Sequence, residues 1–219
     1  MGSHGGALFD VGPGRDCAIC PRLKAFRDVN RRAFPDWENA PVESFGNSDA
    51  ELLIVGLAPG LRGANRTGRP FTGDYAGDLL YETLLSLGFA TGIYGRRPDD
   101  GLRLSGCAIT NAVRCVPPLN KPTPAEISSC RPFLKSTMRN LPKLRAILAL
   151  GRIAHDSVLK AFGEKLSAHP FAHGARHDLG ADGPAIFDSY HCSRYNTNTG
   201  VLTPRMFADA VGKVRAYLR

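Results

Sequence analysis

Four of the six cysteines fall into two groups whose spacing suits metal binding. Cys17 and Cys20 form a CxxC pair, while Cys115 follows an expected strand and Cys130 lies in the next helix. Four thiolates could close a tetrahedral site, and this set suits zinc and an iron–sulfur cluster alike. Proline lies close after Cys20, Cys115 and Cys130, a feature familiar from [4Fe–4S] ligation. We therefore predict a four-cysteine metal site, the alternative being two core thiols and a redox-active CxxC pair.

The other two cysteines are expected to be structural. Cys107 falls in the middle of an expected strand and is interpreted as a small buried apolar side chain. Cys192 adjoins a candidate active-site histidine and is interpreted as a packing residue of that loop. Disulfides are not expected, because the composition fits a cytoplasmic enzyme.

A glycine-, proline- and arginine-rich segment, 58–74, carries groups that suit a base-binding site. It follows Gly56 and Leu57 at the end of an expected strand, where glycine lets the backbone approach a ligand closely. Phe71 could stack on a base turned out of a nucleic acid, and Asp74 could orient a water molecule.

Two further polar side chains lie close to the carboxyl ends of expected strands. The amide of Asn111 offers a donor and an acceptor to the edge of a pyrimidine, and His191 opens a polar loop that ends at Gly200. The alternatives are a backbone hydrogen bond for Asn111 and a purely structural His191. Both residues share with Gly56 a position close to the carboxyl end of an expected strand.

Strands and helices alternate along the chain in the order that positions these groups. Apolar runs predict strands over 51–57, 106–113, 145–150 and 185–190, and helices over 78–88, 123–140, 151–162 and 203–218. This alternation predicts an α/β fold with a parallel sheet between helices. Ligands of such sheets bind beyond the carboxyl ends of the strands. The first 45 residues stand outside the alternation and are expected to form a helical segment packed on one side.

Composition sets the broad class. The 219 residues are expected to form one domain, 1–219, and 43% hydrophobic with 22% charged residues is ordinary for a globular protein. No run approaches the roughly 20 apolar residues of a membrane span, and Met1 to Ala7 lacks a signal-peptide core, so we expect a cytoplasmic protein without membrane contact. A net charge of +8 suits a polyanionic partner such as DNA.

Taken together, these segments resemble the uracil-DNA glycosylase superfamily, and in particular family 5, the iron–sulfur (type B) enzymes related to family 4. The specific match is the segment Asn65 to Asp74, supported by Thr110 to Pro118, Asn120 to Glu126 and His191 to Gly200. The resemblance extends in order from Cys17 to about Met206. It implies a three-layer α/β/α sandwich around a central four-stranded parallel sheet.

The resemblance also implies a cofactor. A [4Fe–4S] cluster on Cys17, Cys20, Cys115 and Cys130 is expected to hold the N-terminal segment, without electron transfer in the reaction. A bacterial or archaeal, nucleoid-associated enzyme is implied as well.

Residue roles follow from the same resemblance. Phe71 is expected to stack on the flipped uracil, Asn111 to bind its edge, and His191 to donate toward its O2. Other families place an acidic or amide residue in the first motif, where this chain has Ala58 and Pro59, so Asp74 is the expected water-positioning residue. Substrate contacts are expected from Gly56, Ala58, Phe71 and Asn111, and DNA contacts from Arg66, Arg69, Ser193, Arg194 and Tyr195.

The resemblance predicts a monomeric, monofunctional glycosylase that excises uracil, and other deaminated bases such as hypoxanthine or xanthine, from double- or single-stranded DNA. Three alternatives stay open. They are a lesion-binding or cross-linking iron–sulfur protein of weak turnover, a nucleotide-binding α/β enzyme, and a zinc protein without catalysis. The sequence lacks the GxGxxG and P-loop patterns that would favour nucleotide binding.

Overall fold

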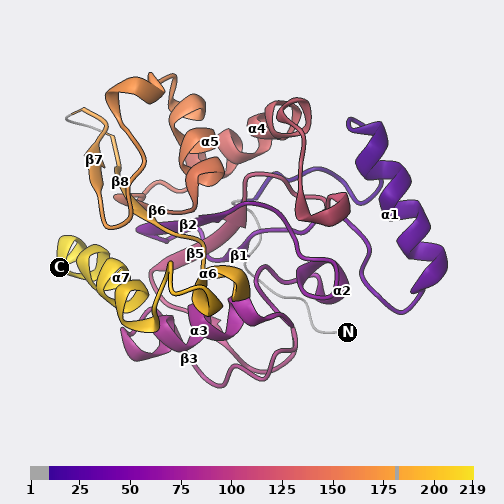
Figure 1. The fold of residues 1–219 in the computed structure, drawn as a ribbon, viewed down its shortest axis with the longest axis horizontal. Coiled ribbons are helices and arrows are strands. Elements are labelled where there is room, and N and C mark those ends of the chain that lie inside the picture. Colours follow the sequence, from indigo (N-terminus) through magenta and orange to yellow (C-terminus); the bar gives the residue numbers. More distant parts are fainter. Residues whose placement is uncertain (1–9, 181–182) are drawn as a thin grey trace.

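The computed structural model describes residues 10–180 and 183–219, so the start at Met1 to Ala7 lies outside the described residues. A six-stranded mixed sheet runs in the order β1-β5-β2-β6-β8-β7 (Figure 1). Its strands are β1 (Phe45–Gly46), β2 (Leu52–Gly56), β5 (Cys107–Asn111), β6 (Ala146–Leu150), β7 (Arg176–Asp178) and β8 (Ala185–Ser189). A separate two-stranded sheet pairs β3 (Ala90–Thr91) with β4 (Arg103–Leu104).

The four central strands confirm the predicted parallel sheet. Strands β5, β2, β6 and β8 pair in parallel, and every residue in them is buried, which explains their continuous apolar runs. The edge strands β1 and β7 pair antiparallel to β5 and β8 and were not predicted. With only two and three residues that are mostly exposed or half-buried, they carry no apolar pattern.

Helices cover both faces of the sheet (Figure 1). Side chains of α3 and α7 pack on the face that holds Leu52 and Ile54, and those of α4 and α5 pack on the face that holds Leu53 and Val55. This arrangement confirms the three-layer α/β/α architecture. The helices are α1 (Pro21–Ala33), α2 (Ala64–Thr67), α3 (Tyr75–Ser86), α4 (Pro124–Arg139), α5 (Arg152–Phe162), α6 (Arg194–Asn198) and α7 (Pro204–Leu218), with 3₁₀ turns η1 (Pro118–Asn120) and η2 (Leu166–Ala168).

Capping residues fix where the helices begin. The predicted capping box is present at α4, where Thr123 and Glu126 bond each other's backbone N–H groups. Helix α3 begins at Tyr75 rather than at the predicted residue 78, because Asp74 is its N-cap and accepts a hydrogen bond from the Gly77 N–H.

The N-terminal segment forms the predicted helix, α1, at one end of the sheet (Figure 1). A buried ion pair ties the start of the described chain to the end of β5, since Arg114 binds both carboxylate oxygens of Asp10 at 2.6 and 2.7 Å. The hydroxyl of Thr137 on α4 also donates to Asp10. None of the described helices has the length and apolar character needed to cross a membrane.

Candidate active site and cysteine pocket

Gly56, at the carboxyl end of β2, brings Phe71 and Asn111 together. A Cβ atom on Gly56 would lie 2.5 Å from Asn111 Oδ1 and 2.6 Å from Phe71 Cζ, so only glycine fits between them. Asn111 ends β5, and β5 is the strand next to β2. Together with Asp74 and His191, these three residues make up the group predicted from the sequence to bind the base and the water, and this group is called the base pocket below.

Phe71 has an unusual backbone conformation. Its φ of +52° lies in the left-handed region, and its carbonyl accepts a hydrogen bond from the Tyr94 hydroxyl. The ring stacks on His191, with ring centroids 5.9 Å apart. Strain of this kind persists only where surrounding contacts impose it, and it is common at ligand sites.

His191 follows β8 and faces Phe71. Burial lowers the pKa of His191 to about 4, so the imidazole is neutral at ordinary pH. A neutral imidazole keeps one N–H donor for a ligand. The backbone carbonyl of His191 accepts a hydrogen bond from the Asn196 side chain, which fixes the start of this loop.

Asn111 carries the clearest sign of a binding site. Its side chain is buried, and its Oδ1 atom has no hydrogen-bond partner among the described residues. A buried carbonyl oxygen without a partner costs about 1–3 kcal/mol, and native structures keep few such groups. The oxygen is therefore available to a ligand that donates an N–H.

The two carboxylate oxygens of Asp74 have different surroundings. One makes a structural contact, and the other lies against the loop after β2. Asp74 Oδ1 caps α3, while Oδ2 lies where a side chain on Gly60 or Gly63 would otherwise sit. Burial raises the pKa of Asp74, and the nearby Asp78 carboxylate adds to the rise. Burial, and then the charge of Asp74, also raise the pKa of the Cys192 thiol, which places Asp74 near the residue that follows His191.

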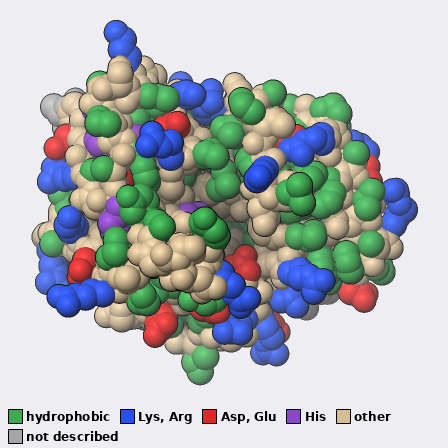
Figure 2. Space-filling model, in the orientation of Figure 1, with side chains coloured by type: hydrophobic (Ala, Val, Ile, Leu, Met, Phe, Trp, Pro, Cys, Tyr) green, Lys and Arg blue, Asp and Glu red, His purple; other side chains and the backbone are tan. Residues whose placement is uncertain are grey.

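Among the predicted DNA contacts, three side chains on the short helices α2 and α6 are exposed. Arg66 on α2 is exposed, Tyr195 on α6 is 74% exposed, and Arg194 is exposed with its guanidinium 5.3 Å from the Tyr75 ring centroid. Ser193 caps α6 by accepting the Asn196 N–H. The face drawn in Figure 2 is hollowed near its centre and carries Lys and Arg side chains around the hollow.

The prediction of a DNA contact for Arg69 is wrong. Arg69 is buried, and its guanidinium binds both carboxylate oxygens of Asp100 at 2.7 and 2.8 Å. Burial would raise the pKa of Asp100, but the hydrogen bonds from Arg69 outweigh it and hold that pKa well below its usual range. The charge of Arg69 is thus used inside the protein.

Ala58 has a packing contact that the sequence did not predict. Its half-buried side chain packs against the cluster of Leu23, Val113 and two cysteines, so the loop after β2 lies between the base pocket and the cysteines. Its predicted contact with substrate stays a prediction.

The basic segment 15–32 proves to be occupied largely by internal contacts. Its basic side chains pair with acidic groups or backbone carbonyls: Arg15 with Glu38, Arg22 with Glu126, Lys24 with Asp28, Arg27 with the Cys17 carbonyl, and Arg31 with Asp16. These pairings leave this segment less free positive charge for a polyanionic partner than the net charge of +8 suggests.

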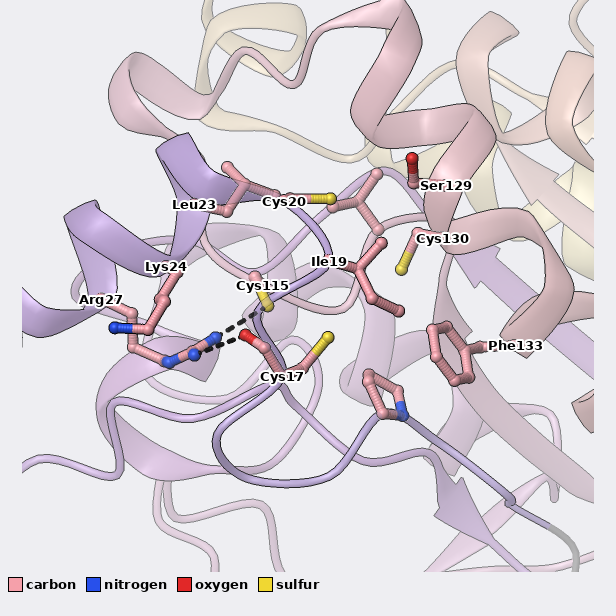
Figure 3. A pocket seen from close by; sticks show the side chains of 12 residues that line it. Cys17, Ile19, Cys20, Leu23, Lys24, Arg27, Cys115, Ser129, Cys130 and Phe133 are labelled. Atoms are coloured by element: carbon pink, nitrogen blue, oxygen red, sulfur yellow. Dashed lines mark hydrogen bonds between the residues drawn. The ribbon is translucent and has the colours of Figure 1, made fainter.

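The four predicted metal ligands line one pocket (Figure 3). Cys17 and Cys20 lie before and at the start of α1, while Cys115 follows β5 and Cys130 lies on α4. In Figure 3 the four sulfur atoms point into the pocket, which Ile19 and Phe133 also line. These residues are called the cysteine pocket below.

Two sulfur atoms of the cysteine pocket accept hydrogen bonds. The Arg27 guanidinium donates to Cys115 Sγ at 3.4 Å, and the Arg114 backbone N–H donates to Cys130 Sγ at 3.3 Å. Such donors suit sulfur that carries negative charge. Cys107 and Cys192 lie outside this pocket and are buried, as predicted.

Sequence reasoning missed a histidine cluster that contacts β8, the strand before the loop that begins at His191. Asp188 on β8 binds His155 Nδ1 at 2.7 Å and His177 Nε2 at 2.9 Å. The ring of His173 stacks on Tyr190, the residue before His191. No sequence signal joins these residues, because they come from α5, β7 and the connection between them.

Comparisons with known proteins agree with the geometry. Residues 43–215 match the family model of the uracil DNA glycosylase superfamily, whose enzymes hydrolyse N-glycosyl bonds. A type-5 uracil-DNA glycosylase of Thermus thermophilus is 47% identical over 201 residues, which cover 89% of this chain and 90% of the relative. The chain therefore belongs to the uracil DNA glycosylase superfamily, within its type-5 group.

Two further type-5 uracil-DNA glycosylases support this grouping. The one from Mycobacterium bovis is 44% identical over 88% of this chain and 75% of its own length. The one from the archaeon Pyrobaculum aerophilum is 38% identical over 92% of this chain and 88% of its own.

Proposed function

We propose that this protein excises uracil from DNA by hydrolysing the N-glycosidic bond and leaves an abasic site. The observation that carries this proposal is the unpartnered, buried Oδ1 of Asn111 beside the ring of Phe71. Uracil presents an N–H between two carbonyl groups, so the amide of Asn111 can accept from that N–H and donate to one carbonyl.

The base pocket supports recognition by stacking as well. A uracil rotated out of the helix would lie on the Phe71 ring, which packs close to the backbone of Gly56 because that residue has no side chain. His191, neutral because of its low pKa, would donate its N–H toward uracil O2 as negative charge develops there. Stabilising the departing anion with a fixed donor is the main expected source of rate enhancement.

Asp74 is proposed to position the attacking water. The carboxylate stays negative above its raised pKa, and this charge also balances the developing positive charge of the sugar. Ala58 and Pro59 offer no side chain for that task. No lysine is assigned as a covalent nucleophile, so the enzyme is expected to be monofunctional.

DNA binding is proposed to use the exposed rim of the base pocket. Arg66 and Arg194 would contact phosphates, and Tyr195 would fill or wedge the gap left by the flipped base. Ser193 would contribute from the helix start that it caps. We propose that a monomer acts on double- and single-stranded DNA at the bacterial or archaeal nucleoid.

A [4Fe–4S] cluster is proposed for the cysteine pocket, where it would join the N-terminal segment to the sheet and take no part in electron transfer. Tetrahedral zinc with Zn–S bonds of about 2.3 Å needs sulfur atoms roughly 3.8 Å apart. Across residues 10–180 and 183–219, no three cysteine sulfurs lie within 4.8 Å of one another. This wider spacing, and the N–H donors aimed at Cys115 and Cys130, favour the larger cluster.

The test is a panel of duplexes that contain uracil, hypoxanthine or xanthine, each scored with and without alkali. We expect free uracil from the first duplex and strand breaks only after alkali. Release of hypoxanthine or xanthine would extend the substrate range to deaminated purines. Tight binding of the uracil duplex without base release would instead identify a lesion-binding protein, which the nonpolar Ala58 and Pro59 leave open.

A further inference from the structure

Leu119 stands apart from the other apolar side chains of the protein. It is 87% exposed, the highest value among the large hydrophobic residues described. Its φ of +56° and ψ of +23° place it in the left-handed region, which disfavours branched side chains. An isolated exposed leucine is ordinary, but one held in a strained backbone is a sign of function.

Prolines and backbone hydrogen bonds define the turn around Leu119. The residue follows Pro117 and Pro118, and the next residue, Asn120, also has a positive φ, of +55°. Backbone hydrogen bonds from Asn120 to Pro117 and from Lys121 to Pro118 close the turn. A projecting side chain on such a loop loses little entropy when it contacts a partner.

Contacts from α1 and α4 brace the same loop. Arg22 on α1 donates to the Lys121 carbonyl at 3.0 Å and binds both oxygens of Glu126 at 2.7 and 2.8 Å. Glu126 in turn accepts the Thr123 N–H in the capping box of α4. The strained turn is therefore held between two helices.

The strand order relates this loop to the one that carries Tyr195. Leu119 follows β5 and Tyr195 follows β8, and β2 and β6 lie between those strands, so both loops leave the same edge of the sheet. Three strand spacings amount to roughly 14 Å between the ends of β5 and β8. Asn111 ends β5 and His191 follows β8, so the base pocket lies along the same edge from which both loops leave.

We propose that Leu119 is a second apolar wedge, which packs into the base stack of duplex DNA on the opposite side of the base pocket from Tyr195. The partner is therefore double-stranded DNA, and the inference rests on the proposed uracil excision. Apolar wedges unstack a base step and so lower the cost of rotating a nucleotide out of the helix. Single-stranded DNA has no paired stack to open, so its cleavage should not need this side chain.

The test compares wild type with Leu119→Gly. Glycine adopts a positive φ without strain, so this variant removes the side chain and keeps the turn. We expect kcat/KM for uracil in duplex DNA to fall about tenfold, while the value for single-stranded DNA stays within about twofold. Leu119→Phe, which restores an apolar side chain, should recover most of the duplex activity.

A matched control is Phe162→Ala. Phe162 is also an exposed apolar residue, but it ends α5, which runs back from the β6 end to the opposite edge of the sheet. It should leave both activities unchanged. Equal duplex rates for wild type and Leu119→Gly would overturn the proposal, and so would equal losses on both substrates.

A second readout separates this proposal from uracil excision itself. A 2-aminopurine beside the uracil brightens when the stack opens, whether or not the base is released. We expect wild type to raise this fluorescence in duplex DNA and Leu119→Gly to raise it much less. No uracil release with a Leu119-dependent rise would refute the excision and keep the wedge, whereas equal rises would refute the wedge.

Discussion

The base pocket and the cysteine pocket are neighbours, but they differ in whether the protein supplies hydrogen-bond donors to their acceptor atoms. In the cysteine pocket the protein directs N–H groups at Cys115 and Cys130. In the base pocket it leaves the buried Oδ1 of Asn111 without a partner among residues 10–180 and 183–219. The first arrangement suits a permanently bound cofactor that stabilises the fold. The second suits an exchanging ligand that supplies its own hydrogen-bond donor.

The comparison predicts the largest effect on stability at the cysteine pocket. Cys115→Ser should abolish the brown colour and visible absorbance of the cluster and leave a protein that unfolds readily. Structural metal sites contribute on the order of 10 kcal/mol to folding. Absorbance, iron content and thermal unfolding measure this effect. Cys107→Ser is the matched control, because Cys107 is buried in β5 away from the pocket and should keep the colour. A colourless wild type with stoichiometric zinc would contradict the cluster.

At the base pocket, Asp74→Asn should affect chemistry without affecting stability. Asparagine caps a helix as well as aspartate, so α3 should keep its N-cap while the negative charge is lost. Single-turnover uracil release should fall by about 10²–10⁴-fold. A near-normal rate would remove Asp74 from catalysis, and an equally large fall in melting temperature would make its role structural.

The pH dependence of uracil excision shows which protonation state of Asp74 is active. The pKa of Asp74 is raised, so wild-type activity should fall as pH drops through that raised value and the carboxylate gains a proton. His191, with a pKa of about 4, stays neutral above that pH and should add no second limb between pH 5 and 8. The slow residual activity of Asp74→Asn should be independent of pH over this range. A wild-type loss toward high pH instead would contradict the requirement for a negative Asp74.

Asn111→Ala should separate recognition from folding. The variant deletes a buried oxygen without a partner among the described residues, so the free energy of unfolding should fall only slightly. Urea denaturation measures this free energy. Uracil excision should fall roughly 10–100-fold, which corresponds to a lost buried hydrogen bond or two. Excision of hypoxanthine, where the wild type performs it, should fall less. Equal losses on both bases would argue against recognition of the uracil edge.

The smallest effects on activity are expected for the exposed arginines that are proposed to contact phosphates. Arg66→Ala and Arg194→Ala should each reduce the slope of log Kd against log salt by about 1, as expected for one phosphate contact. Arg69→Ala is the informative contrast, since it should leave the slope unchanged and destabilise the fold by about 3–5 kcal/mol through the stranded Asp100 charge. A lower salt slope in Arg69→Ala would show that Arg69 contacts DNA phosphates after all.

Much of the fold was predictable because each central strand is a continuous apolar run. Parallel pairing then placed Gly56, Asn111 and His191 at one edge of the sheet, and the structure has all three there. The short edge strands β1 and β7 were not predictable, because two or three mostly exposed residues have no period.

Charged side chains showed the limit of sequence reasoning. Arg69 stands in a basic segment, but its partner Asp100 lies 31 positions further on, and only the fold brings them together. Asp74 was predicted as a catalytic carboxylate, yet its role as the cap of α3 depends on a helix start that apolar spacing placed too late. Leu119 drew no attention, since neither its exposure nor its positive φ can be read from its residue type.

Inhibition by free bases tests the central claim most directly, namely that Asn111 accepts the N–H of uracil. Uracil excision would be measured in the presence of uracil or 3-methyluracil, with wild type and Asn111→Ala. The account predicts that uracil inhibits wild type while 3-methyluracil, which lacks the N–H, does not, and that Asn111→Ala no longer distinguishes them. Equal inhibition of wild type by both bases would contradict it.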